Sequence, residues 1–262
     1  MKSITDFVKM KTKKEKISLV TCYDFWSARI IDNSNIDAVL VGDSSAMVMH
    51  GYETTINAST DMLSYHIASV KRGTKNKLII ADLPFLELRK GTGKFYKSVD
   101  IIMKSGANAV KIEGASGNVE LINELVLSGV PVMGHLGLTP QSIYQLGGYK
   151  IQGKDDKSSE KIFRDSILLQ NAGCFAIVLE MIPSTLAKKI TDEFEIPTIG
   201  IGAGPDTDGQ ILVLHDLLGL NKDFNPKFVR KYFNGYDEIL SALNHYSLDV
   251  KQNKFPAAEE SN

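Results

Sequence analysis

Ala109-Val110-Lys111-Ile112-Glu113-Gly114 is the stretch that decides the fold. Its β-branched, apolar composition and terminal glycine predict a short buried strand. Side chains alternate between the two faces of a strand, so Lys111 and Glu113 point to the same face. Two opposite charges on a buried face are costly unless they pair with each other or serve a site. Taken alone, the hexapeptide leaves both a structural ion pair and a functional site open.

Seven further segments share this strand-like composition, and amphipathic segments alternate with them. The predicted strands cover 17–22, 38–41, 78–82, 130–135, 175–180, 197–202 and 211–215. Nearly continuous apolar strands that alternate with helices indicate a parallel sheet covered on both faces. Eight strands in 262 residues favour an α/β fold with a single (β/α)8 TIM barrel, which typically needs about 250 residues, over an open doubly wound sheet.

The two ends of the chain lie outside this repeat. A helix is predicted from Ile4 to Met10, with Ser3 as its cap, and another over 226–245. The tail from about Lys254 is predicted to be disordered. No interdomain linker is evident, so residues 1–262 are interpreted as one domain.

Composition narrows the class of protein. Hydrophobic residues make up 43% of the chain, which is enough for a large core. The formal net charge of -1 argues against nucleic acid or a membrane surface as a partner. Cys22 and Cys174 are interpreted as buried thiols in a reducing compartment. The chain shows neither a signal sequence nor a run of about 20 apolar residues, and a cytoplasmic protein is expected.

Ionisable residues close five consecutive predicted strands. Catalytic residues of such barrels collect at the carboxyl ends of the strands, and here those ends carry Asp43, Asp82, Lys111 with Glu113, His135 and Glu180. Each has a structural explanation in isolation, such as a turn cap or a surface ion pair. Their recurrence at one rim favours an active site.

The inventory at this rim suggests a reaction class. Asp43, Asp82 and Glu113 suit a hard divalent cation such as Mg²⁺, held directly or through water. Glu180 could move a proton, and Lys111 with His135 could stabilise an anionic oxygen. Together these groups suit proton removal next to a carbonyl, with an enolate stabilised by the metal.

Two glycine-rich stretches have more than one interpretation. The stretch 200–204 follows the seventh strand, where many barrels bind phosphate. A tight turn or close backbone packing explains it equally well. The stretch 134–142, Gly-His-Leu-Gly-Leu-Thr-Pro-Gln-Ser, could form part of a lid.

These motifs together resemble the ketopantoate hydroxymethyltransferase family over about residues 3–246. The matching segments, in the order of the family, are Val41-Gly-Asp-Ser44 with Met47, Asp82-Leu-Pro-Phe85, Val110-Lys-Ile-Glu-Gly114, 134–142, Leu179-Glu180, Ile199-Gly-Ile-Gly-Ala-Gly204 and Asp208-Gly-Gln-Ile-Leu-Val213. The resemblance implies a barrel of the phosphoenolpyruvate/pyruvate type. It also implies transfer of a hydroxymethyl group from 5,10-methylenetetrahydrofolate to 3-methyl-2-oxobutanoate, giving 2-dehydropantoate in the first committed step of pantothenate and coenzyme A synthesis.

The resemblance also assigns roles by residue. It implies an Mg²⁺ site at Asp43, Asp82 and Glu113, and keto-acid contacts at Asp43, Ser44, Asp82 and Lys111, with His135 near the substrate. Glu180 corresponds to the proton acceptor. A homo-oligomer, commonly a decamer, is implied as well.

The chain departs from the family pattern at two places. Ser45-Ala46 stands where the family usually has Leu-Gly, and Leu86-Glu87-Leu88-Arg89 where small residues are common.

Three rival functions stay open. They are a metal-dependent lyase of the isocitrate lyase or phosphoenolpyruvate mutase type, a Schiff-base aldolase that uses Lys111, and a non-catalytic binding scaffold. The lyases usually carry a cysteine-bearing loop, which neither cysteine here supplies.

Overall fold

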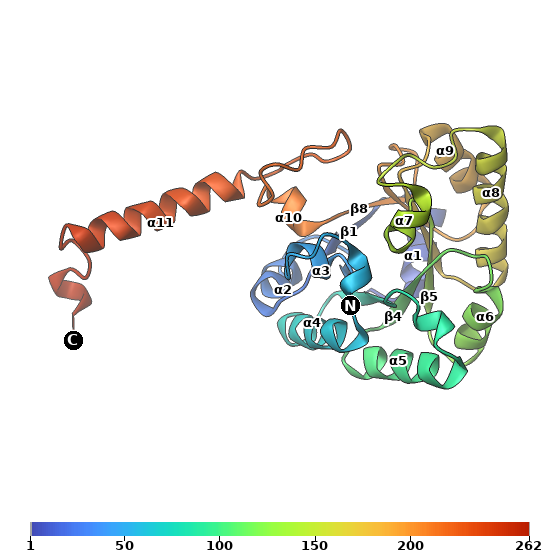
Figure 1. The fold of residues 1–262 in the computed structure, drawn as a ribbon, viewed down its shortest axis with the longest axis horizontal. Helices are drawn as coiled ribbons and strands as arrows, with labels where there is room; N and C mark the ends of the chain where they lie inside the picture. The colour runs from blue at the N-terminus through green and yellow to red at the C-terminus, as the bar shows by residue number, and fades with distance from the viewer. Residues whose placement is uncertain (1, 262) are drawn as a thin grey trace. The chain divides into compact units, whose positions relative to one another are not determined.

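The computed structural model describes residues 2–261 and contains a closed barrel of eight parallel strands (Figure 1). The strands follow one another around the barrel in chain order, and β8 pairs with β1 to close it. Their bounds are β1 Ile17–Thr21, β2 Ala38–Val41, β3 Leu78–Asp82, β4 Ala109–Glu113, β5 Val132–Gly137, β6 Ala176–Glu180, β7 Thr198–Ile201 and β8 Gly209–Leu212. The predicted TIM barrel is confirmed.

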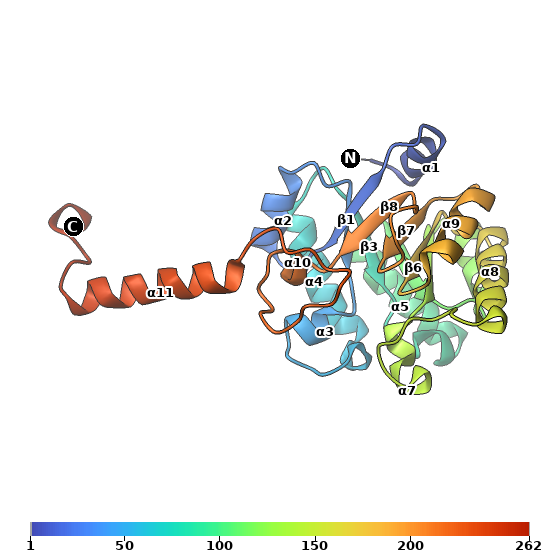
Figure 2. The ribbon, with the colours of Figure 1, turned by 90° about the horizontal axis from the view of Figure 1, so that it is seen from above.

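Helices connect the strands from β1 to β7 and cover the outside of the barrel, whereas β7 and β8 are joined by a segment without a helix. The longer ones are α2 Phe25–Asp32, α4 Thr60–Gly73, α5 Thr92–Lys104, α6 Val119–Leu127, α8 Asp156–Asn171 and α9 Ser184–Glu193. Short helices lie in the connections: α3 Ser45–Val48, η1 Thr55–Asn57, η2 Glu87–Arg89, η3 Pro140–Ser142 and α7 Ile143–Leu146. Figure 2 shows α7 at the end of the barrel opposite to α1, which spans Ile4–Thr12.

The register of β4 explains its charged residues. Asp82 on β3 aligns with Lys111, and Glu113 aligns with His135 on β5. The barrel interior below this layer is apolar. It includes Leu19, Leu40, Ile80, Ala109, Met133, Val178 and Ile199, all of them buried. Lys111 and Glu113 share the inward face with Ala109, so the charges lie directly above the apolar core.

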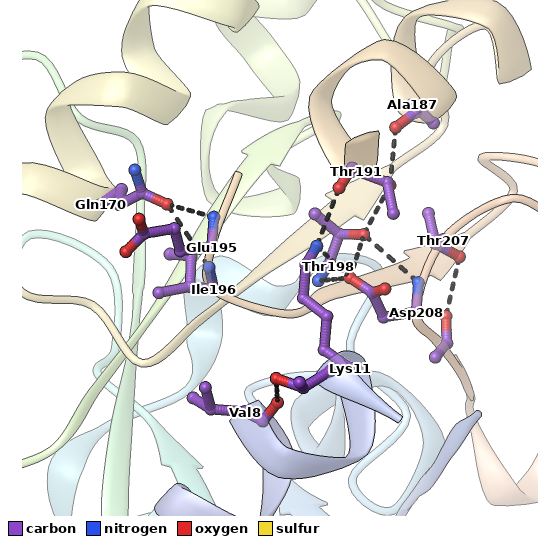
Figure 3. A network of polar contacts seen from close by, with 12 residues as sticks. Val8, Lys11, Gln170, Ala187, Thr191, Glu195, Ile196, Thr198, Thr207 and Asp208 are labelled. Atoms are coloured by element: carbon purple, nitrogen blue, oxygen red, sulfur yellow. Dashed lines mark hydrogen bonds and ion pairs between the residues drawn. The ribbon is translucent and has the colours of Figure 1, made fainter. Parts of the chain in front are cut away.

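Helix α1 covers the amino-terminal ends of the strands. Phe7 is fully buried and packs edge-on against Phe175, at a centroid distance of 6.0 Å. Lys11 Nζ contacts Asp208 Oδ2 at 2.7 Å and the carbonyl oxygen of Thr191 at 2.8 Å (Figure 3). Thr198 N–H donates to the same Asp208 oxygen at 2.9 Å. Helix α1 is therefore fixed to the barrel by both packing and charge.

The last predicted strand was placed too late. Strand β8 begins at Gly209, where a Cβ would lie 2.4 Å from the Ile17 carbonyl oxygen. Glycine permits this close approach to β1. The segment predicted as strand 211–215 instead turns at Val213 into the short helix α10, Leu214–Leu217. The carboxy-terminal helix α11 spans Gly235–Lys251, later than predicted.

Contacts divide the chain into two compact units, Met1–Leu212 and Val213–Asn262. The second unit contains α10, α11 and the 3-10 helix η4, Ala258–Glu260. Interpretation of residues 1–262 as one domain stays a prediction, as does disorder of the tail from about Lys254. Within residues 2–261, no helix is both long and apolar enough to span a membrane.

Candidate active site

The seven predicted site residues lie on or directly after five neighbouring strands, at their carboxyl ends. Asp43 and Ser44 follow β2, Asp82 ends β3, Lys111 and Glu113 lie on β4, His135 lies on β5, and Glu180 ends β6. The structure connects six of them through direct contacts, and Ser44 is next to Asp43 in the chain. Asp43, Asp82, Lys111 and His135 are each at most 4% exposed.

Lys111 is at the centre of this cluster. Its Nζ lies 2.9 Å from Asp82 Oδ1 and 3.9 Å from Glu113 Oε1. Burial alone would lower the pKa of Lys111, but the carboxylates of Asp82, Glu113 and Asp43 outweigh burial and raise the pKa. The amine is therefore held as an ammonium ion.

Asp43 has the opposite balance of effects. Burial, followed by the negative charges of Asp82 and Glu113, raises the pKa of Asp43 well above its usual range. Its backbone N–H donates to Asp82 Oδ2 at 2.9 Å. The Gln141 side-chain amide donates to Asp43 Oδ2 at 2.8 Å. A divalent cation would relieve the repulsion that destabilises ionised Asp43.

His135 connects Lys111 to Glu180. Lys111 Nζ lies 3.1 Å from His135 Nδ1, and because an ammonium can only donate, Nδ1 accepts in the neutral ring. The ring proton is then on Nε2, which lies 3.2 Å from Glu180 Oε2. Burial and Lys111 lower the pKa of His135, but Glu113 and Glu180 more than offset them and raise it.

Glu113 is held at both its side chain and its backbone. Burial raises the pKa of this carboxyl, but His135, Lys111 and the Gln141 N–H outweigh burial and lower it. Asn118 Nδ2 donates to the Glu113 carbonyl oxygen at 3.0 Å. Arg89 in turn donates to Asn118 Oδ1 at 2.7 Å. The unusual stretch 86–89 thus supports the strand that carries Glu113.

Ser44 is positioned by a residue that sequence reasoning missed. The Ser44 hydroxyl lies 2.8 Å from the Tyr23 hydroxyl, and Tyr23 is 1% exposed. Tyr23 comes two residues after the end of β1, so its place after a strand was the signal available in the sequence. Gln141 was also missed as a site residue, although it lies within the quoted stretch 134–142.

Glycine allows the ends of β5 and β6 to approach each other. Gly137 has φ +94°, and a Cβ there would lie 2.1 Å from the Glu180 carbonyl oxygen. In the stretch 200–204, Gly204 has φ +85° and a Cβ there would lie 2.5 Å from Ser184 Cβ. A tight turn therefore accounts for Gly204, and phosphate binding by this stretch stays untested.

Both cysteines are unpaired and buried, as predicted. Cys22 follows β1, and its thiol lies 3.4 Å from the Ser27 hydroxyl, under helix α2. Cys174 precedes β6, so it lies at the amino-terminal end of that strand, whereas Cys22 lies at the carboxyl end of β1. Neither thiol is a group of the candidate site.

The donor set fits a hard divalent cation. Glu113 Oε1 is buried and accepts no hydrogen bond within residues 2–261, whereas the buried Asp82 Oδ1 has Lys111 Nζ as its partner at 2.9 Å. Three carboxylates and one ammonium leave a net charge of −2, the complement of a dication. In the described part of the chain no three His, Cys, Asp or Glu side chains are already gathered as a metal site, and Lys111 Nζ contacts both Asp82 and Glu113.

Solved structures with the same fold differ widely in sequence. Phosphonopyruvate hydrolase in complex with oxalate and Mg²⁺ matches with a TM-score of 0.64 at 10% identity, covering 99% of this chain and 93% of that one. The 2,3-dimethylmalate lyase, described as a member of the PEP mutase/isocitrate lyase superfamily, matches with a TM-score of 0.61 at 15% identity, covering 98% and 90%. At these identities the likeness shows the fold alone.

Sequence relatives are much closer. The 3-methyl-2-oxobutanoate hydroxymethyltransferase of Bdellovibrio bacteriovorus is 55% identical over 261 residues, covering 100% of this chain and 99% of its own. The enzyme of the same name from Legionella pneumophila (strain Lens) is 54% identical, covering 98% and 99%. The family profile described as ketopantoate hydroxymethyltransferase matches residues 1–258. Identity at this level over the whole length means that the chain belongs to the ketopantoate hydroxymethyltransferase family.

Proposed function

We propose that this protein transfers a hydroxymethyl group from 5,10-methylenetetrahydrofolate to 3-methyl-2-oxobutanoate, giving 2-dehydropantoate. The observation that carries the proposal is the buried cluster of Asp43, Asp82, Lys111, Glu113 and His135, which adjoins Glu180 at the rim. The family match supplies the identity of the reaction.

Asp43, Asp82 and Glu113 would hold a divalent cation, with Mg²⁺ as the expected ion. A cation bound there would supply a Lewis acid that polarises the 2-oxo group and makes the adjacent C3–H bond more acidic. The oxygen-only donor set and the buried carboxylate oxygens of Asp82 and Glu113 support this choice.

Glu180 is the proposed base. It lies at the rim with 18% of its side chain exposed, whereas the other carboxylates of the cluster are buried more deeply. His135 Nε2 lies 3.2 Å from Glu180 Oε2, so the imidazole is next to that carboxylate. Glu180 removes the C3 proton, and the electron pair of the C–H bond forms the enolate.

Lys111 and Ser44 act on the oxygen atoms of the keto acid. The ammonium of Lys111 stabilises the enolate oxygen as its charge develops, and Ser44 donates from the position that Tyr23 fixes. The enolate carbon then forms a bond to the methylene carbon of the folate, and one of the two C–N bonds of that methylene breaks. Water replaces the second C–N bond with a C–O bond. The two nitrogens take up the proton removed from C3 and one proton of the water, which releases tetrahydrofolate and the hydroxymethyl product.

The proposal extends to assembly and location. Half-exposed apolar side chains on α11, namely Ile239, Leu243 and Tyr246, are suited to burial in a homo-oligomer such as a decamer. Two free thiols support a cytoplasmic protein. Light scattering of the purified chain gives the subunit number.

A turnover assay tests the function. Purified protein is incubated with 3-methyl-2-oxobutanoate and 5,10-methylenetetrahydrofolate, with Mg²⁺ or with EDTA, and 2-dehydropantoate is measured. Product is expected with Mg²⁺, with loss on EDTA and recovery when Mg²⁺ is restored. Product formation that EDTA leaves unchanged would refute the metal-assisted mechanism, and no product under any condition would refute the function.

A further inference from the structure

Gln141 joins the ends of three strands. It lies in η3, after β5, yet its side-chain amide donates to Asp43 Oδ2 at 2.8 Å and to the Leu83 carbonyl oxygen at 2.9 Å. Its backbone N–H donates to Glu113 Oε2 at 3.1 Å. Both N–H groups of the amide and the backbone N–H are therefore used at the candidate site.

These hydrogen bonds occupy one oxygen on each of two carboxylates. Gln141 holds Oδ2 of Asp43 and Oε2 of Glu113. On the third carboxylate, Asp82 Oδ2 accepts the Asp43 backbone N–H at 2.9 Å, and Oδ1 lies 2.9 Å from Lys111 Nζ, so both oxygens are in contact with the protein. Glu113 Oε1, by contrast, accepts no hydrogen bond in the described part of the chain. Gln141 thus holds one oxygen of Asp43 and one of Glu113.

We infer that Gln141 is a positioning residue that fixes one oxygen of Asp43 and one of Glu113, and thereby sets the preference for Mg²⁺ over Ca²⁺. This inference rests on the metal site in the proposed function. Mg²⁺ requires near-ideal octahedral geometry, whereas Ca²⁺ accepts six to eight ligands and bidentate carboxylates. A carboxylate fixed through one oxygen suits the smaller, stricter ion.

The Leu83 contact makes the restraint directional. Because one amide N–H is bound to the backbone after β3, the other is aimed at Asp43. Substitution of Gln141 by Ala or Leu removes both side-chain donors but keeps the backbone N–H to Glu113. Asp43 would then be free to rotate and present both oxygens. Loss of supporting hydrogen bonds of this kind typically lowers metal affinity by about 10–100-fold.

The test measures Mg²⁺ and Ca²⁺ binding by calorimetry on the metal-free wild-type chain, Gln141→Ala, Gln141→Leu and Gln152→Ala. Gln152 is the matched control, since it is on the same β5–α8 connection and, within residues 2–261, its amide donates only to the Lys150 carbonyl oxygen at 2.9 Å. In both Gln141 variants the Kd for Mg²⁺ is expected to rise about tenfold, while the Kd for Ca²⁺ stays within about twofold of the wild-type value. Gln152→Ala is expected to match the wild type.

The ratio of the two affinities separates positioning from general damage. A thermal unfolding scan of each variant confirms that it is folded. Gln141→Leu keeps most of the side-chain volume and therefore serves as the test variant if Gln141→Ala does not fold. An unchanged Mg²⁺/Ca²⁺ affinity ratio in both folded variants would overturn the role of Gln141. Absence of binding of either ion to the wild-type chain would instead overturn the metal site of the proposed function.

Discussion

Asp82 and Lys111 are aligned on neighbouring strands, and Lys111 Nζ lies 2.9 Å from Asp82 Oδ1. Both side chains are buried, at 2% and 4% exposure. An ion pair in this environment is stable only with good geometry and further charge compensation, which Glu113 and Asp43 provide for Lys111. The pair that could have been purely structural is thus part of a larger charged site.

The state of Lys111 separates a metal-assisted reaction from a Schiff-base aldolase. A nucleophilic lysine must lose its proton, and here the surrounding carboxylates raise the pKa of Lys111. Incubation with 3-methyl-2-oxobutanoate and borohydride is therefore expected to leave the protein mass unchanged, as measured by intact mass spectrometry. A single adduct that maps to Lys111 would contradict the proposed role and favour the aldolase.

Glu180→Gln tests the assignment of the base. The amide retains the size of the side chain but cannot accept the C3 proton. Exchange of the C3 hydrogen of 3-methyl-2-oxobutanoate with deuterated solvent, followed by NMR without folate, is expected to slow by about 10²–10⁴-fold. Binding of the keto acid is expected to remain close to that of the wild type.

Glu160→Gln is the control for this experiment, because Glu160 is exposed on α8. It should exchange the C3 hydrogen at the wild-type rate. Wild-type exchange in Glu180→Gln as well would remove Glu180 from the role of base.

Sequence patterns located β2 and β3 at their observed bounds and β4 to within one residue, because each run is closed by a polar residue or by glycine. The same patterns placed the ionisable residues at one rim, since parallel strands in a barrel end on the same side. Family resemblance then supplied roles that periodicity could not. The gathering of these residues at one rim was therefore predictable from the sequence, whereas their chemical roles stay predictions.

The bounds of β8 and the contacts of Gln141 could not be predicted from local sequence, because both depend on residues distant in the chain. The run from Ile211 to Leu214 is apolar, and composition cannot separate a strand from a short helix over such a length. Pairing of β8 with Ile17 to Val20 of β1 decides where the strand lies. Gln141 likewise has no local signature, because its partners come from three other strand ends.

The burial of both thiols predicts low reactivity. Burial raises the pKa of Cys22 to about 11 and that of Cys174 to about 12, and only a thiolate reacts rapidly. At pH 8 the native protein is expected to show almost no reaction with Ellman's reagent over minutes, and unfolding in guanidinium should expose two thiols per chain. Rapid native modification accompanied by loss of turnover would instead indicate a cysteine at the site, as in the rival lyases.

The amino-terminal end of the barrel offers a stability test that is separate from chemistry. Lys11→Met breaks the contacts with Asp208 and the Thr191 carbonyl oxygen, in a pair whose side chains are 14% and 15% exposed. We expect a loss of about 1.5–3 kcal/mol in the free energy of unfolding, measured in urea, because the removed hydrogen bonds involve charged, largely buried groups.

Lys104→Met is the matched control, since its pair with Asp100 on α5 is 76% and 54% exposed and should contribute about 0.3–0.5 kcal/mol. C3–H exchange in folded Lys11→Met is expected to equal the wild-type rate, because Lys11 lies at the end of the barrel opposite to Glu180. Equal losses of stability in the two variants would mean that the contacts of Lys11 do not fix α1 to the barrel.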